Sequence, residues 1–306
     1  MKDGCAVVVG GVNIDICGRP SLPPVPRDSN PGRVISSLGG VGRNIAHNMA
    51  LLGMPVTLLT ALGDDHNALR VEASCAALGI DLSHALRLPG ETTSTYLFIT
   101  DHRGEMELAV SDMEIYRHLT PQYLEAQLPL LNAAPLVVAD ANIPASSLAF
   151  LAQHCTAPLF VDPVSTAKAE KLRPILGRLH TLKPNRLEAA LLTGVDIVDQ
   201  VSLQLAAGKL LDTGLRRVFI SLGAEGVLCA DHREIVQLPI YPGTMKNATG
   251  CGDAFMAALA WAFCGGLSLE ASAKAGLAAA SIALAGEETI NPALSPSALT
   301  AVMDRR

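Results

Sequence analysis

Two glycines and a carboxylate stand at the start of a long apolar run near the C-terminal end of the chain. Gly250, Cys251 and Gly252 precede Asp253, and "AFMAALAWAF" follows, the pattern of a buried helix. Free amides at a helix start cradle an anion, and glycine lets a ligand approach the backbone closely. A carboxylate there suits a base that takes a proton from a hydroxyl while the amides hold the charge of a transferred phosphoryl group. Asp253 equally fits a plain helix N-cap.

Two other groups of small and polar residues lie in the first sixth of the chain. Asn13 and Asp15 follow the apolar run "AVVVG", and because alternate residues of an extended chain point the same way, they could grip neighbouring hydroxyl groups. An Asx turn would use the same residues. Residues 36–53, "SSLGGVGRNIAHNMALLG", place bare backbone before Asn44 at the start of an amphipathic pattern. That arrangement suits a polyhydroxy ligand or a tight turn from a strand into a helix.

Two motifs in the second half of the chain combine turn chemistry with candidate phosphate chemistry. In "HTLKPNRLEAALLTG", Pro184 ends a strand, Asn185 begins a helix and Glu188 lies one turn further on. Asn185 and Glu188 form a capping box, or they position Mg²⁺-bound water near a nucleotide phosphate. In "SLGAEGVLC", residues 221–229, two glycines predict a tight hairpin, against which a nucleotide could lie.

Short apolar runs alternate with helical patterns along most of the chain. The runs lack polar alternation, as parallel strands covered on both faces do, and they read "AVVVG", "VTLLTAL", "PLVVAD", "PLFVDP", "LHTLKP" and "RVFISLG". The periodicity predicts helices near residues 43–52, 68–78, 146–154, 185–193 and 202–213. This alternation predicts an α/β fold with a doubly wound, mostly parallel sheet and helices on both faces. In such folds ligands bind beyond the carboxyl ends of the strands.

Two segments interrupt that pattern. Residues 15–38 carry five prolines, and residues 92–111 resemble a β-hairpin that turns at "DHRG". Together they predict a small β sheet inserted into a single domain that spans residues 1–306. We expect this sheet to act as a lid over the ligand; surface loops and an edge hairpin are the alternative.

The composition argues against nucleic-acid and membrane partners. The chain has 306 residues, a net charge of -6 and no block of lysine or arginine, so a nucleic-acid backbone is a poor partner. The apolar run of residues 254–267 is too short to span a bilayer, and the first apolar run is a strand rather than a signal peptide. Seven cysteines, with no C-x-x-C pair, favour free thiols in a reducing cytoplasm over a zinc site. Walker, H-E-x-x-H and G-x-S-x-G motifs are absent from the sequence.

Taken in order, these motifs resemble those of the ribokinase-like (PfkB) family of carbohydrate and nucleoside kinases. The family has N-x-D near its start, then G-G-x-x-x-N, N-x-x-E, a strand ending in T/S-x-G-x-x-G, and D-T-x-G-A-G-D near its end. All five have counterparts here, spread over nearly the whole chain. The resemblance implies the ribokinase-like fold and an ATP-dependent kinase that uses Mg²⁺.

The resemblance also implies a role for each matching residue. Asp253 is expected to be the general base, with the amides of Gly250, Cys251 and Gly252 as the anion hole. The remaining implied contacts are to the ribose from Asn13, Asp15, Gly39, Gly40 and Asn44, to Mg²⁺ through water from Asn185 and Glu188, and to the nucleotide from Asn185, Ser221, Gly223 and Gly226.

Several stretches outside these motifs narrow the resemblance to the members of the family that phosphorylate pseudouridine. They are "DSNPG", "GGVGRNIA", "TSTY", "GEM" and "VDPVS", and they imply contacts on the base and lid side from Ser29, Thr93, Ser94 and Lys168.

Two positions depart from the family pattern. Asn247 replaces an aspartate that helps to hold a monovalent cation in relatives, which weakens the case for K⁺, and Cys251 replaces an alanine.

We therefore expect a cytoplasmic enzyme that transfers phosphate from ATP to the 5′-hydroxyl of pseudouridine. The same chemistry on ribose, another nucleoside or a sugar is the first alternative, because shared motifs do not fix a substrate. A non-catalytic sensor of sugars or nucleotides is the second, although a sensor does not need a base at Asp253. The hairpins leave a sheet face that substrate, the main domain or a second subunit must cover, and we expect a homodimer formed through the lids.

Overall fold

An eight-stranded sheet forms the centre of the molecule. The computed structural model describes residues 4–305. Across the sheet the strands are β14 (Ile235–Leu238), β13 (Val227–Asp231), β12 (Arg217–Ser221), β11 (Thr181–Leu182), β10 (Leu159–Asp162), β9 (Val137–Asp140), β1 (Ala6–Val9) and β4 (Val56–Leu59). The six from β12 to β4 run parallel, and β13 and β14 add an antiparallel edge. Each of the six apolar runs found in the sequence contributes a strand, so the predicted parallel sheet is confirmed.

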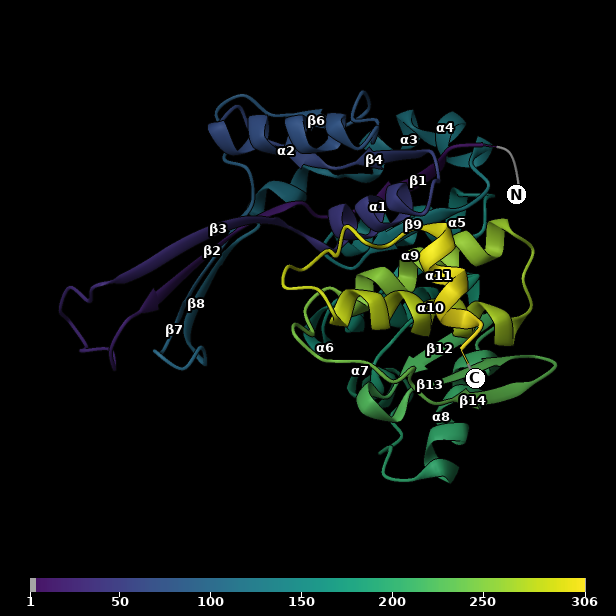
Figure 1. Ribbon diagram of the computed structural model, residues 1–306. Helices are drawn as coiled ribbons and strands as arrows, with labels where there is room; N and C mark the ends of the chain where they lie inside the picture. The colour runs from purple at the N-terminus through teal and green to yellow at the C-terminus, as the bar shows by residue number, and fades with distance from the viewer. Residues whose placement is uncertain (1–3, 306) are drawn as a thin grey trace.

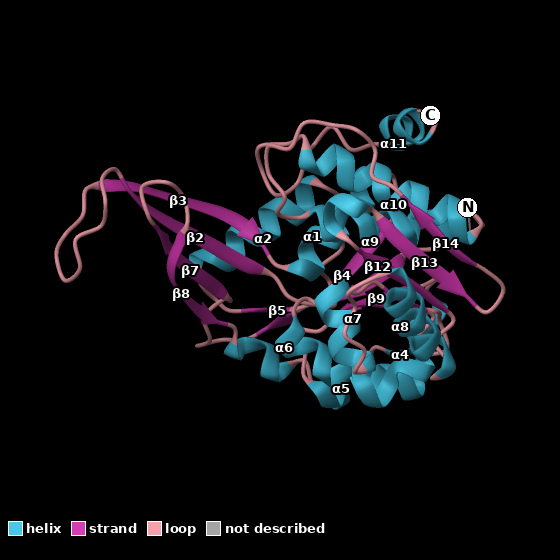
Figure 2. Ribbon diagram, turned by 90° about the horizontal axis from the view of Figure 1, so that it is seen from below, coloured by secondary structure: helices cyan, strands magenta, loops and turns pink. Residues whose placement is uncertain are grey.

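Helices cover both faces of this sheet, because its strands are apolar on both sides. Along β1, Ala6 and Val8 enter one buried cluster while Val7 and Val9 enter the other. The first cluster lies under α1 (Val41–Leu51), α2 (His66–Ala77), α9 (Cys251–Cys264), α10 (Leu269–Leu284) and α11 (Pro296–Met303). The second lies under α3 (Pro121–Ala126), α4 (Leu128–Ala133), α5 (Ala145–His154), α6 (Thr166–Ala169), α7 (Arg186–Thr193) and α8 (Gln200–Asp212), with the 3₁₀ segments η1 (Glu114–His118) and η2 (Glu170–Arg178). Figure 2 shows the two helical layers on opposite sides of the strands.

A second sheet projects from the edge of this body as an arm (Figures 1 and 2). Its order is β3 (Gly32–Gly39), β2 (Asn13–Pro20), β7 (Thr95–Thr100) and β8 (Met106–Asp112). The two segments that break the pattern in the sequence supply these strands. We call this four-stranded sheet the arm sheet. A short pair, β5 (Ala61–Leu62) with β6 (Leu86–Arg87), lies near its base.

The chain order places a topological switch at β1. From β1 the chain passes to β4 on one side, and later to β9 and β10 on the other. Loops that leave neighbouring strands in opposite directions open a crevice at the carboxyl ends, which is where open α/β sheets bind ligands. The arm sheet begins at this crevice, since only residues 10–12 separate the end of β1 from the start of β2.

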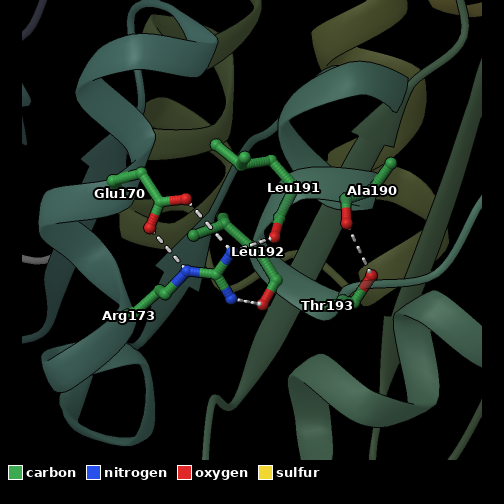
Figure 3. Close-up of polar contacts among 6 residues, drawn as sticks. All are labelled: Glu170, Arg173, Ala190, Leu191, Leu192 and Thr193. Carbon is green, nitrogen blue, oxygen red and sulfur yellow. Dashed lines mark hydrogen bonds and ion pairs between the residues drawn. The ribbon is translucent and has the colours of Figure 1, made fainter.

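Helix α7, which carries the N-x-x-E motif, is fixed at its C-terminal end by Arg173 of η2. Figure 3 shows the Arg173 guanidinium donating to the carbonyls of Leu191 and Leu192 while Glu170 accepts from the same group. The last carbonyls of a helix lack intrahelical partners, so a cation there satisfies them and complements the helix dipole. At its other end, α7 is joined to the carboxyl edge of the sheet, where Asn185 forms a bridge with Ser221 and the Ser221 amide donates to the Pro184 carbonyl at 2.9 Å.

Within residues 4–305, no helix combines the length and the apolar character needed to cross a bilayer.

Candidate active site

The carboxyl edge of the sheet gathers the polar residues of the strands. Asp140 ends β9, Asp162 ends β10, Lys183 directly follows β11 and Ser221 ends β12. Because these strands are parallel and adjacent, side chains far apart in sequence meet at one edge. Asp140, Asp162 and Lys183 are all buried. A row of buried charged groups at this edge is the first mark of a site.

Asp253 is the third residue of α9 and not its N-cap, so the N-cap alternative is wrong. Gly250 caps the helix with φ 84°, and a Cβ there would lie 2.1 Å from the Thr289 carbonyl oxygen. Only glycine fits both constraints. The buried Asp253 carboxylate instead accepts a hydrogen bond from Asn44 Nδ2 at 2.8 Å. The structure thus brings together two of the residues singled out from the sequence.

Burial raises the pKa of Asp253 to about 8, with a further contribution from the Asp162 carboxylate. The Asn44 hydrogen bond and the Lys183 ammonium act in the opposite direction and lower that pKa. A carboxyl group with a pKa near neutrality can hold or release a proton at physiological pH, as a general base requires.

Lys183 is the cation of this cluster, and sequence reasoning missed it. Its Nζ lies 3.2 Å from Asp162 Oδ2, and a Cβ on Gly252 would lie 3.2 Å from Nζ. Burial lowers the pKa of Lys183, but the neighbouring carboxylates of Asp162, Asp253 and Glu188 raise it more. The ammonium therefore stays charged beside the start of α9. The available signal was a lysine at the end of a predicted strand, just before the N-x-x-E motif.

The two glycines before α1 bring the base of the arm sheet against the end of β1. Gly40 has φ 92°, and a Cβ there would lie 2.5 Å from the Gly11 carbonyl oxygen. A Cβ on Gly39 would lie 2.0 Å from Asp15 Oδ2. This segment is therefore a tight strand-to-helix turn, and it also leaves bare backbone beside a carboxylate.

Asn13 and Asp15 lie in strand β2 rather than in an Asx turn, and they share one face of the arm sheet because they are two residues apart. Asn13 Oδ1 accepts from Ser94 Oγ at 2.5 Å and from the Tyr116 hydroxyl at 2.9 Å. Burial raises the pKa of Asp15 to about 6, while the Arg43 guanidinium lowers it. Arg43 lies inside the stretch 36–53 but was given no role there, and Tyr116 of η1 had no sequence signal.

Thr93 and Ser94 are buried at the base of the arm sheet. The Thr93 hydroxyl donates to Asp65 Oδ1 at 2.8 Å and accepts from the Gly63 amide at 3.1 Å. Both hydroxyls are therefore bonded within the protein, and they fix where β7 leaves the body. Ser29 lies apart from them, exposed in the loop at the far end of the arm, between β2 and β3.

Lys168 lies in α6, close to the carboxyl end of β9. Its Nζ donates to Asn142 Oδ1 at 2.5 Å, and its pKa is lowered by burial against the opposing effect of Asp140. Asp140 itself accepts from the amides of Gly11 and Asn142, both at 2.8 Å. The side chains of Lys168 and Asn142 thus lie together at the carboxyl edge of the sheet.

Asn185 and Glu188 form the capping box that the sequence predicts, with reciprocal bonds of 2.9 and 2.8 Å. The Glu188 side chain is buried, and burial raises its pKa. Among residues 4–305, no three His, Cys, Asp or Glu side chains are grouped so that they could hold a metal directly. A carboxylate beside Asp162 and Lys183 still suits Mg²⁺ that keeps its own water ligands.

A pocket of about 450 Å³ lies beside the start of α9. It joins the predicted nucleotide residues to the predicted anion hole and to an apolar wall. Its lining is Lys183, Ser221, Gly223, Ala224, Gly226, Ile240, Tyr241, Gly243, Met245, Ala248, Cys251, Gly252, Phe255, Leu277, Ala280, Ser281 and Leu284. Mostly apolar walls with a few convergent polar groups suit a flat heteroaromatic ligand that carries an anionic tail.

Asn247 ties the loop before α9 to the segment after α10. Its Oδ1 accepts from the Thr249 amide at 2.9 Å, which leaves Nδ2 to donate to the Glu287 carbonyl at 3.2 Å. An amide hydrogen already points at that carbonyl oxygen. This donor arrangement does not fit a cation ligand, because a cation needs oxygen atoms facing it.

The chain belongs to the pfkB family of carbohydrate kinases, whose model matches residues 5–296. It is 38% identical to pseudouridine kinase of Escherichia coli over 94% of this chain and 93% of that protein. It is 37% identical to an uncharacterized sugar kinase of the same organism, YeiI, over 94% of this chain and 80% of that protein. The structure of Arabidopsis thaliana ribokinase complexed with ribose and ATP matches 99% of both chains with a TM-score of 0.88 and 22% identity, which shows the ribokinase-like fold.

Proposed function

We propose that this kinase transfers the γ-phosphoryl group of ATP to the 5′-hydroxyl of pseudouridine. The observation that carries the proposal is the position of Asp253: it directly follows Gly252, which lines the nucleotide-sized pocket, and it accepts a hydrogen bond from Asn44, on the helix that follows arm strand β3. A base at that junction can reach an acceptor hydroxyl on one side and a phosphoryl group on the other. The 38% identity to a protein named pseudouridine kinase supports this acceptor.

In the proposed reaction, Asp253 takes the proton of the acceptor hydroxyl. The freed oxygen forms a bond to the γ-phosphorus while the bond from that phosphorus to the β–γ bridging oxygen breaks, and ADP leaves with the electron pair. The amides of Gly250, Cys251 and Gly252 would stabilise the charge on the transferred group, since the first amides of a helix lack intrahelical partners and the Cys251 amide makes only a long contact, 3.5 Å, with the Ala248 carbonyl oxygen. Lys183, next to Gly252, adds a positive charge there.

Asn185 and Glu188 would hold Mg²⁺ through its water ligands. The ion would supply positive charge that shields the phosphates of the nucleotide. Ser221, Gly223 and Gly226 would contact the nucleotide, which the pocket lining supports. Gly223 and Gly226 have positive φ, 61° and 97°. A Cβ on Gly226 would lie 1.9 Å from the Leu238 carbonyl oxygen, so glycine there lets the hairpin pack against the end of β14, while the space beside Gly223 is open.

On the acceptor side, Asn13, Asp15 and Asn44 would hold the ribose hydroxyls beside the bare backbone of Gly39 and Gly40. Lys168, together with Asn142, would meet the base. Thr93 and Ser94 would act mainly by fixing the base of the arm sheet, because their hydroxyls are already bonded to Asp65 and Asn13. Ser29 would reach the acceptor only if the arm closes as a lid, excluding water from the reaction.

We expect a strong acceptor preference in a coupled assay of ADP release with ATP and Mg²⁺. Pseudouridine should exceed uridine in kcat/KM by at least about 100-fold, because a site that hydrogen-bonds a polar group rejects analogues that lack it. Adenosine, ribose and fructose complete the panel. The relative named as a sugar kinase makes a sugar the second candidate. Preference for ribose or fructose would discard pseudouridine and keep the role of Asp253.

We expect Asp253→Asn to lower kcat by about 10²–10⁴-fold while ATP affinity is retained. In the wild type, kcat should rise as pH increases through about 8, because the carboxyl must lose its proton before it can accept another. Asp212→Asn, an exposed aspartate at the end of α8, is the matched control and should change neither quantity. Wild-type turnover in Asp253→Asn would exclude Asp253 as the base.

We expect turnover that does not depend on K⁺, because the Asn247 amide already links the loop to the Glu287 carbonyl. In Asn247→Asp a carboxylate would face that carbonyl with no donor between them, so activity should fall and K⁺ should restore it. Initial rates in potassium and tetramethylammonium chloride measure this, with Asn247→Ala as the control that loses the link without gaining a cation ligand. Equal stimulation of the wild type by K⁺ would contradict the expectation.

We also propose that two chains pair through their arm sheets. The strand register places Val34, Leu97, Leu108 and Val110 on the face opposite Asp15, and all four are exposed, Val34 by 76% and Leu108 by 63%. A contiguous apolar sheet face of this kind needs a partner. A second copy covers it without obstructing the Asp15 face.

Sedimentation velocity should therefore give a dimer of the 31.9 kDa chain. Leu108→Lys should yield monomers, because dimerisation would bury an unpaired ammonium group. Leu205→Lys, on the exposed face of α8, should leave the dimer intact. A wild-type protein that sediments as a monomer at every concentration would refute pairing through the arm.

A further inference from the structure

Arg43 is a buried arginine at the start of α1, only 5% exposed, and the roles proposed above leave it unassigned. Its Nη1 donates to the Leu38 carbonyl at 3.2 Å and to Asn44 Oδ1 at 3.4 Å, and its Nη2 donates to Ser74 Oγ at 3.0 Å. One guanidinium thus joins the end of strand β3, the start of α1 and the middle of α2. Its Nε is buried without a partner, so these bonds are made at a cost in desolvation.

Arg43 and Asp253 act from opposite sides on the Asn44 amide, and both favour the same orientation of it. A guanidinium has five donors and no acceptor, so the amide oxygen must point at Arg43. The amide nitrogen then faces the opposite direction, where it donates to Asp253 Oδ2 at 2.8 Å. With the amide turned over, its oxygen would face the carboxylate and its NH₂ group would face the guanidinium. Both contacts would then be repulsive.

We infer that Arg43 is a positioning residue that holds the Asn44 amide in the orientation that stabilises the ionised form of Asp253, and so ties the base of the arm sheet to the catalytic carboxylate. The inference rests on the proposed role of Asp253 as general base. It adds a specific path, which runs from the Leu38 carbonyl at the end of β3 through Arg43 and Asn44 to Asp253. Movement of β3 would reach the base along this path.

Several charged and titratable groups act on the two ends of the path. Asp253 faces Asp140 of β9, Asp162 of β10, Lys183 after β11 and Cys251 of its own helix. Arg43 faces Asp15 of β2, His47 of α1 and Cys75 of α2. Asp15 is the one proposed acceptor ligand among them. Loss of Arg43 should therefore affect acceptor binding through Asp15 and turnover through Asp253, and the two effects separate into KM and kcat.

The test is the pH profile of kcat for Arg43→Met at saturating acceptor. Without the aligned Asn44 donor, the pKa that governs the acid limb of kcat should rise by about one unit. Loss of a hydrogen bond to the charged form of a carboxyl group has an effect of about this size on its pKa. At pH 7 this lowers kcat about tenfold, and kcat should recover toward the wild-type value near pH 10. A general structural defect would lower kcat at every pH.

Two controls make the result specific. Arg70→Met removes another arginine that contacts the arm sheet, through Ser36 Oγ at 2.9 Å, and it should leave the acid limb in place. Asn44→Ala should shift the limb as Arg43→Met does, and the double variant should shift it no further, because both residues act on one path. Additive shifts, or an unshifted limb in Arg43→Met, would overturn the inference.

Arg43→Lys covers the case in which the methionine variant does not fold. It keeps a donor of the same charge without the planar fork, so its limb should lie between those of the wild type and Arg43→Met. If the wild type transfers phosphate to no acceptor in the panel, the proposed function fails. The effect of Arg43 on Asp253 can then still be tested by ¹³C NMR titration, which measures the pKa of the Asp253 carboxyl group directly, with Asp253→Asn assigning the signal. An identical titration in wild type and the Arg43 variants would refute it.

Discussion

The buried carboxylate of Asp253 is the constraint on which the rest of the structure depends. An ionised carboxylate without water is costly, and Asp140 and Asp162 add like charge to the same edge of the sheet. The protein offsets this with Lys183 between the carboxylates and with Asn44 as a neutral donor. The result is a group whose pKa of about 8 lies in the working range of a base. Other arrangements at the site serve to hold these few groups in place.

Close backbone approach provides that hold. A Cβ on Gly42 would lie 2.8 Å from the backbone of Gly10, so α1 packs directly against the end of β1. This contact fixes the start of α1, and with it Asn44, against the end of β1. The same glycine-rich turn ends arm strand β3, so one short segment positions both the donor to Asp253 and the root of the candidate lid.

The two sides of the site differ in how their positions are held. On the nucleotide side, the α7 capping box, the β12–β13 hairpin and the start of α9 lie on packed elements of the body. On the acceptor side, Asn13 and Asp15 belong to the arm sheet, which projects from the body (Figure 1). Hydrogen bonds from Ser94, Tyr116 and Thr93 concentrate at its root. Under the proposed function, this arrangement would suit a preformed nucleotide site and an acceptor site that the arm completes by closing.

The sequence by itself determined the features whose causes lie within a few residues. Apolar runs without polar alternation predicted the parallel strands, the spacing of Asn185 and Glu188 predicted the capping box, and the glycines before Asp253 predicted a helix start with exposed amides. The tertiary structure alone decided between Asp253 as an N-cap and Asp253 as a buried partner of Asn44, which lies 209 positions away. It also brought in Lys183, Tyr116 and Arg43. No local pattern specifies such pairs, because they form only where α1, α9 and η1 pack at the carboxyl edge of the sheet, and burial there, which sets the pKa values, is a property of the packed chain.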